Sequence, residues 1–98
     1  MNIQSMLKQA QKLQKEMMDA KEEIDKSIFE GKSSLVSVEM NGKKELLKVK
    51  IDAEKIENDE IEMLEDMILI AVNDAIKKID KATEEKIGKY TRGLPGLF

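Results

Sequence analysis

The first 30 residues contain neither glycine nor proline, and apolar residues recur among them at alternating steps of three and four. The residues of this heptad stripe are Ile3, Met6, Ala10, Leu13, Met17, Ala20 and Ile24. Such spacing predicts a helix with a narrow apolar seam, as in coiled coils. A helix over residues 3–26 would be roughly 36 Å long. A compact chain of 98 residues has a radius of gyration of only about 13 Å. The helix must therefore project from the body or lie along a second chain.

The middle of the chain changes to a period of two, which is typical of strands. Two alternating runs, Leu35–Met40 and Glu45–Ile51, flank the pair Asn41-Gly42. We predict a β-hairpin here, because Asn and Gly tolerate the positive φ angles of tight hairpin turns. The segment 27–31 is either a third short strand that ends at its glycine or the fraying end of the first helix.

A second amphipathic helix is predicted over residues 59–87, and its apolar face is wider than a coiled-coil seam. Asp59, with Glu62 three residues later, fits a capping box at the start of this helix. Gly88 and the stretch Gly93-Leu94-Pro95-Gly96 are expected to end it. Residues 88–98 are then a flexible tail that ends in apolar residues.

These elements predict a single α+β domain over residues 1–98: a helix (1–26), a sheet (27–51), a second helix (59–87) and the tail. The sheet has an open edge, and both helices are too long for the body to cover. We therefore expect a symmetric homodimer. The residues expected at its interface are Met6, Leu13, Met17, Val38, Val49, Ile68 and Val72.

The composition argues against most catalytic chemistry, because the chain has no His and no Cys. Residues 52–63 are acidic but lack the central Gly and final Glu of a calcium loop. No glycine-rich phosphate loop follows a strand. We expect no enzyme activity, no metal or other cofactor and no small-molecule substrate.

The longest apolar run, residues 67–72, is too short to span a membrane. The first residues lack the apolar core of a signal peptide. A cytoplasmic location without membrane contact is therefore expected.

The formal net charge of −3 conceals an uneven distribution along the chain. Residues 51–66 carry −7, whereas residues 1–50 and 67–98 carry +2 each. Six lysines form two clusters at helical spacing: Lys8, Lys12 and Lys15 on the first helix, and Lys77, Lys78 and Lys81 on the second. Each cluster is either a solvated face or a set of DNA phosphate contacts. The chain has one Tyr, two Phe and no Trp, too few aromatic side chains for a base-stacking platform. Double-stranded DNA, bound with little sequence specificity, is therefore the favoured nucleic acid.

Several segments resemble the YbaB/EbfC family of nucleoid-associated proteins. The run MLKQAQKLQKEM at residues 6–17 is similar to the family's first helix, and LVSVEMNG at 35–42 with VKID at 49–52 is similar to its hairpin. EMLEDMI at 62–68 and AVNDA at 71–75 look like its second helix, and the ending LPGLF is also of its type.

This resemblance covers nearly the whole chain in the right order. It implies an α-β-β-β-α fold with a third strand near Ile28, and a tight, intertwined homodimer with projecting helices. It also implies DNA binding at the bacterial nucleoid, with an influence on DNA organisation and gene expression. The alternative is a protein-interaction scaffold or adaptor that uses the Met-rich helix and the apolar C-terminal tail.

Overall fold

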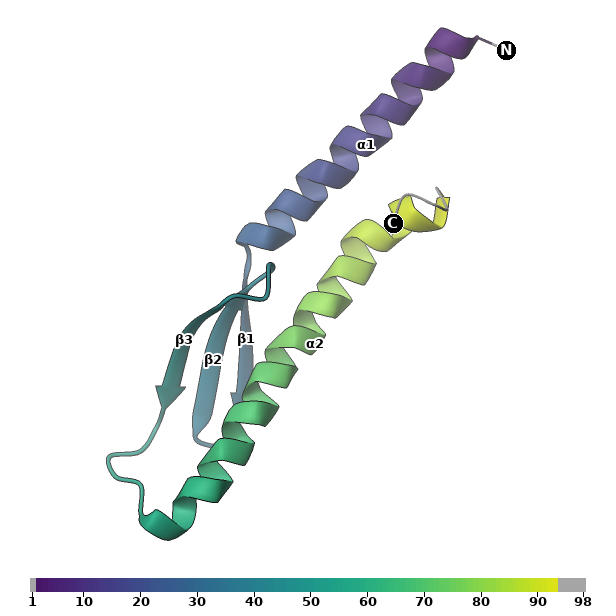
Figure 1. The fold of residues 1–98 in the computed structure, drawn as a ribbon. Coiled ribbons are helices and arrows are strands. Elements are labelled where there is room, and N and C mark those ends of the chain that lie inside the picture. The colour runs from purple at the N-terminus through teal and green to yellow at the C-terminus, as the bar shows by residue number, and fades with distance from the viewer. Residues whose placement is uncertain (1, 94–98) are drawn as a thin grey trace.

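The structure, a computed structural model, describes residues 2–93 and contains two long helices and a three-stranded antiparallel sheet (Figure 1). The elements are α1 (Ile3–Lys26), β1 (Ile28–Ser33), β2 (Val36–Asn41), β3 (Leu46–Ile51), a short 3₁₀ helix η1 (Asn58–Glu60) and α2 (Ile61–Gly93). The strands lie in the order β1-β2-β3. The predicted α-β-β-β-α fold is thereby confirmed. The principal extents are 71 × 20 × 14 Å, so the molecule is strongly elongated.

Helix α1 has the range that the heptad stripe predicts. Its first turn is capped by Asn2, whose Oδ1 accepts a hydrogen bond from the amide of Gln4 at 3.0 Å. At the other end, the Ser27 hydroxyl donates to the carbonyl of Glu23 at 2.7 Å. The chain then turns directly into β1, which begins at Ile28. The segment after the first helix is therefore a strand and not the fraying end of α1.

Strand β1 does not end at Gly31, as the sequence indicates, but continues to Ser33. Gly31 is buried where β1 passes beneath α2. A Cβ at this position would collide with the carbonyl oxygen of Ala71 and lie 2.7 Å from the amide nitrogen of Ala75. The glycine is thus required for the close approach of strand and helix and does not terminate the strand.

The hairpin between β2 and β3 is present, but its turn differs from the predicted one. The positive φ angle falls on Lys44 (φ 65°), and neither Asn41 nor Gly42 has the left-handed conformation. Asn41 holds the turn together, since its Oδ1 accepts hydrogen bonds from the amides of Lys43 (2.9 Å) and Glu45 (3.1 Å). The loop is therefore longer than a two-residue turn.

The core lies between β2 and α2. Its buried residues are Val36, Val38 and Met40 from β2 and Ala71, Ala75 and Ile79 from α2. Val38 is only 1% exposed in the single chain, because it packs in this core. The alternation in β2 sends Ser37 and Glu39 to the outer face of the sheet.

Helix α2 differs from the prediction at both ends. Its capping box begins earlier than predicted, because the Glu57 amide donates to Glu60 Oε1 at 3.2 Å and the helix starts through η1. At the other end α2 continues through Gly88 to Gly93, so residues 88–93 of the predicted flexible tail are helical. Residues 94–98 lie outside the described part of the chain. Between residues 2 and 93, neither helix is long and apolar enough to cross a bilayer.

Candidate nucleic-acid interface

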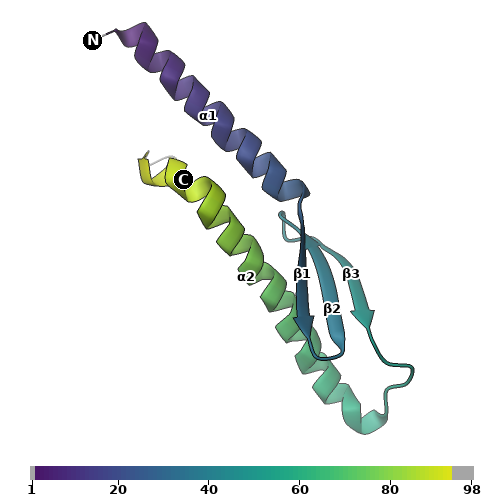
Figure 2. The ribbon, with the colours of Figure 1, turned by 180° about the vertical axis from the view of Figure 1, so that it is seen from behind.

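The N-terminal part of α1, residues 3–16, extends beyond the end of α2 (Figures 1 and 2), and we call it the arm. Only the other end of α1 is anchored, where Ile24 is 3% exposed. Farther along the arm, Leu13 is 40% and Met6 is 52% exposed, and Ile3 is 73% exposed. The arm is therefore accessible on all sides in the single chain.

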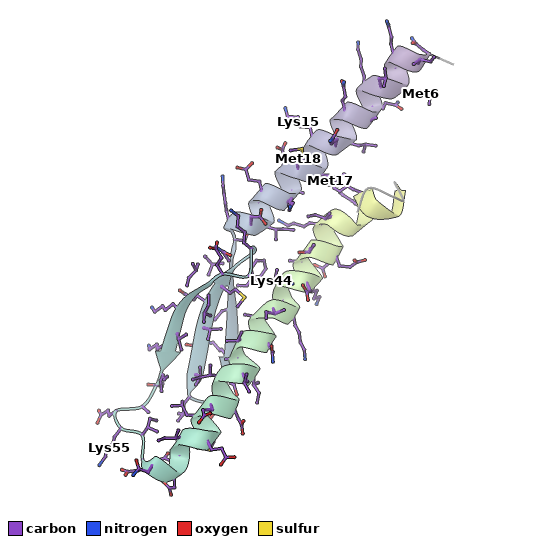
Figure 3. All side chains as sticks on the ribbon, viewed as in Figure 1. Met6, Lys15, Met17, Met18, Lys44 and Lys55 are labelled. Carbon is purple, nitrogen blue, oxygen red and sulfur yellow. The ribbon has the colours of Figure 1, made fainter. Side chains whose placement is uncertain are left out.

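The lysines of the first cluster, Lys8, Lys12 and Lys15, lie on the arm opposite its apolar stripe, as a turn of about 100° per residue requires. In Figure 3, Lys15 lies on the side of α1 away from α2, and Met17 lies on the side toward it. Residues 1–15 contain no Asp or Glu. Within the described part of the chain, none of these three lysines has an ion pair. The arm thus carries three exposed positive charges on one face.

The second cluster lies on α2 and is less uniform. The ammonium group of Lys78 donates to the carbonyl of Glu30 at 2.6 Å and lies 3.5 Å from Asp74 Oδ2, so it ties α2 to β1. Lys77 and Lys81 are exposed and have no ion pair with any residue that the structure describes. Of this cluster, only Lys78 is tied to another element in the part of the chain that the structure describes.

The two clusters are not brought together within one chain. Ile24 of α1 and Ile87 of α2 line the same small hollow and mark the junction of the helices. The lysines of the arm precede Ile24 and those of α2 precede Ile87, and the helices run in opposite directions (Figure 1). The two clusters therefore extend away from this junction in opposite directions.

Ion pairs fix the base of the arm. Lys86 of α2 lies 2.7 Å from Glu23 Oε1, and Lys44 of the hairpin loop lies 3.0 Å from Asp80 of α2. Within α1, a hydrogen bond from Lys26 lowers the pKa of Glu22, whose carboxylate lies 2.8 Å from the Lys26 ammonium. Sequence spacing does not reveal the two long-range pairs, because each joins residues far apart in the chain.

Strand β3 is exposed along its whole length and lies farthest from α2 (Figure 2). Val49 is opposite Val38, and Ile51 is opposite Val36, so these side chains share the face that α2 covers on β2. Val49 is nevertheless 43% and Ile51 38% exposed. An apolar strip beside α2 is thus uncovered in the single chain.

The other residues predicted at a dimer interface have mixed positions. Met6 and Leu13 are exposed on the arm, and Met17 is half-buried near its base. Ile68 and Val72 of α2 are half-buried against the core. Val49 is therefore the predicted interface residue that most clearly combines an apolar side chain with a free strand edge.

The structure offers no metal site in residues 2–93, since no three His, Cys, Asp or Glu side chains converge there as ligands would.

The chain is similar to known proteins in sequence and in fold. A model of the YbaB/EbfC DNA-binding family matches residues 1–94. A nucleoid-associated protein of Ligilactobacillus salivarius is 46% identical, over 99% of this chain and 95% of its own length. A nucleoid-associated protein of Lactococcus lactis is 50% identical, over 97% of this chain and 98% of its own. The crystal structure of an uncharacterized protein from Helicobacter pylori superimposes with a TM-score of 0.67 at 23% identity, over 87% of this chain and 91% of that one, and supports the fold.

Proposed function

The chain belongs to the YbaB/EbfC DNA-binding family, and we propose that it binds double-stranded DNA at the bacterial nucleoid through the lysine face of its arm. The observation that carries this proposal is the arrangement of Lys8, Lys12 and Lys15 on one side of an exposed helix that has no Asp or Glu before residue 16. The family is a DNA-binding family and not a family of enzymes.

The chemistry of this face favours phosphate contacts over base reading. Lys presents a point charge that suits a phosphate oxygen and carries little information about the base. The chain has only one Arg, Arg92, and therefore little capacity for bidentate guanine contacts. The arm carries no aromatic side chain on which an unpaired base would stack. Binding with little sequence specificity and a strong dependence on salt follows.

The decisive experiment replaces the three arm lysines with Gln and measures duplex affinity by fluorescence anisotropy across a range of salt concentrations. Affinity should fall for every duplex sequence, and the log–log salt slope should become shallower by about 0.9 for each phosphate that the variant no longer neutralises. The matched control is Lys48→Gln, Lys50→Gln and Lys55→Gln, which makes the same charge change on the sheet and the connector. If the two triple variants lose affinity equally, the arm is not the contact surface.

We further propose that the functional unit is a homodimer. The uncovered face of β3 and the free edge of this strand leave Leu47, Val49 and Ile51 in water, which disfavours an isolated chain. A second copy related by a two-fold axis would cover this surface and would supply a second lysine arm. Two arms on one duplex would double the number of phosphate contacts.

Sedimentation equilibrium tests this assembly directly. The wild-type chain of 11.2 kDa should sediment with twice that mass. Val49→Asp should weaken self-association, because it places a charge on the apolar face of β3. Lys50→Asp is the control, since its side chain lies on the other face of the same strand. A monomeric wild type would refute the homodimer. The proposal of phosphate contacts would still be tested separately by the lysine variants.

A further inference from the structure

The direction of the arm is set at its base, because α1 is anchored only there. Ile24 is buried, whereas Met6 and Leu7 are more than half exposed. Two neighbours meet this base: the C-terminal part of α2 and the loop that joins β2 to β3. The contacts with these two neighbours fix the angle of α1 at its base, and this angle determines where the arm lysines lie.

The loop touches α1 at Gly42, and there is no space for a side chain between them. A Cβ at Gly42 would collide with the carbonyl group of Ile24 and lie 2.9 Å from the Asp25 Cα. All of these atoms belong to the backbone, so a change of rotamer cannot relieve the collision. Gly42 is outside the left-handed region, so this glycine is required by the close contact and not by its φ angle.

The loop itself is held in place and cannot easily retreat. Asn41 Nδ2 donates to Glu45 Oε1 at 2.8 Å, in addition to the two amide hydrogen bonds that Asn41 Oδ1 accepts. The Lys44 ammonium lies 3.0 Å from Asp80 Oδ1 and ties the loop to α2. A side chain at position 42 would therefore displace the base of α1 more readily than it would displace the loop.

Displacement at the base is amplified along the arm. Lys15 lies nine residues and Lys8 sixteen residues before Ile24, which corresponds to about 14 Å and 24 Å along the helix axis. Ordinary contact with a Cβ requires at least 3.4 Å, so the backbone at Ile24 must move away from the loop to make room. A tilt about the anchored end would carry the lysines several times farther than the base itself moves.

We propose that Gly42 is a positioning residue for DNA binding: its missing side chain sets the angle of the lysine arm. The ion pair between Glu23 and Lys86 acts at the same base as a second restraint. The effect on DNA rests on the proposed function, whereas the effect on arm geometry does not. The core residues of β2 and α2 lie outside this contact, so arm angle and core stability are separable.

The test measures arm geometry first. Gln4→Cys and Lys50→Cys place a donor and an acceptor dye on the arm and the sheet of a chain that has no native cysteine. Labelled chains are mixed with excess unlabelled chain, so that energy transfer reports distances within one chain. Gly42→Ala should shift the mean transfer efficiency, and Ser34→Ala, a methyl side chain in the other hairpin turn, should not.

Duplex affinity is then measured for the same variants without dyes. Gly42→Ala should bind more weakly and with a shallower salt slope, while its urea unfolding retains the cooperative transition of the core. An unchanged transfer efficiency would overturn the proposal. So would an arm that moves without any change in affinity, when the lysine variants do lose affinity. If wild type binds no DNA at all, the proposed function fails, and energy transfer still decides the geometry.

Glu23→Gln provides a second test of the proposal if the Gly42→Ala variant does not fold. This change breaks the ion pair with Lys86 without adding volume, and an exposed pair contributes little to stability. The distribution of transfer efficiencies should broaden, because the arm loses one restraint. Its mean position is not displaced by a steric clash, since no volume is added. A distribution as narrow as that of wild type would count against control of the arm at its base.

Discussion

Gly31 shows how one missing side chain determines the packing of the sheet against α2. Gly31→Ala would press a methyl group into the backbone at Ala71 and Ala75, and both residues are fully buried. We expect the free energy of unfolding to fall by about 1–3 kcal/mol, as in other overpacked cores. Urea unfolding measures this change. Lys32→Ala, at the next and exposed position of β1, should remain close to wild type, and an equal loss there would point to strand propensity as the cause.

Asp74 links the stability of the fold to pH. Its pKa is lowered chiefly because its carboxylate accepts the backbone N–H of Lys32 at 3.1 Å, and Lys78 adds to the effect. The unfolded chain, with an ordinary pKa of 3.8, binds the proton more readily than the folded chain. This stabilisation is therefore present above the ordinary pKa and is lost as the pH falls through the lowered value.

We accordingly expect Asp74→Asn to lower the melting temperature at neutral pH by a few degrees. The difference from wild type should shrink as the pH falls below 3.8, because the wild-type carboxylate is then protonated as well. Thermal unfolding at a series of pH values and one protein concentration measures this. Asp66→Asn, an exposed acid on the same helix, provides the comparison. A difference that stays constant down to acidic pH would contradict the role of the charge.

At the scale of elements, the sequence predicts what is encoded locally. The bounds of α1 follow from its heptad stripe, and the hairpin from two alternating runs. The interpretation of Gly31 and Gly88 as ends of elements is wrong, although glycine is a common local terminator. Gly31 is instead required by its close contact with Ala71, a residue 40 positions away in the chain. No local sequence pattern reveals such a contact.

In the candidate site, too, the sequence predicts features that depend on local spacing and misses contacts between residues far apart in the chain. Helical spacing suffices to place the arm lysines on one face. The tie from Lys78 to Glu30 joins residues 48 positions apart and becomes visible only in the folded chain. The alternation in β2 identifies an apolar face without saying what covers that face. In the structure α2 of the same chain covers it.

The two helices should differ in local stability. The arm has exposed backbone hydrogen bonds and few packing partners, whereas α2 is buried around Ala71, Ala75 and Ile79. Hydrogen exchange should therefore be faster for residues 6–16 than for residues 71–79. Duplex DNA should slow exchange in the arm and leave the buried segment of α2 unchanged. Protection that appears only in α2 would place the DNA contact elsewhere.

At the scale of the whole molecule, a net charge of −3 is compatible with DNA binding because opposite charges are far apart. The acidic segment 51–66 lies at the end of the molecule opposite the arm, along an axis of 71 Å (Figure 3). The Debye length at physiological salt is only about 8 Å. Acids at one end are therefore screened from a phosphate bound at the other.

This separation of charges predicts which acidic residues influence the affinity for duplex DNA. Neutralising Glu54, Glu62 and Glu65 in the acidic segment should change duplex affinity by less than about twofold at physiological salt, because they lie several Debye lengths from the arm. Neutralising Glu16 and Asp19 should raise affinity more, although it removes fewer charges. These two acids lie four residues after Lys12 and Lys15, next to the lysine face of the arm. Anisotropy titrations at two salt concentrations compare the sets. A larger gain from the distant set would mean that the net charge of the protein, and not the local charge of the arm, governs its attraction to DNA.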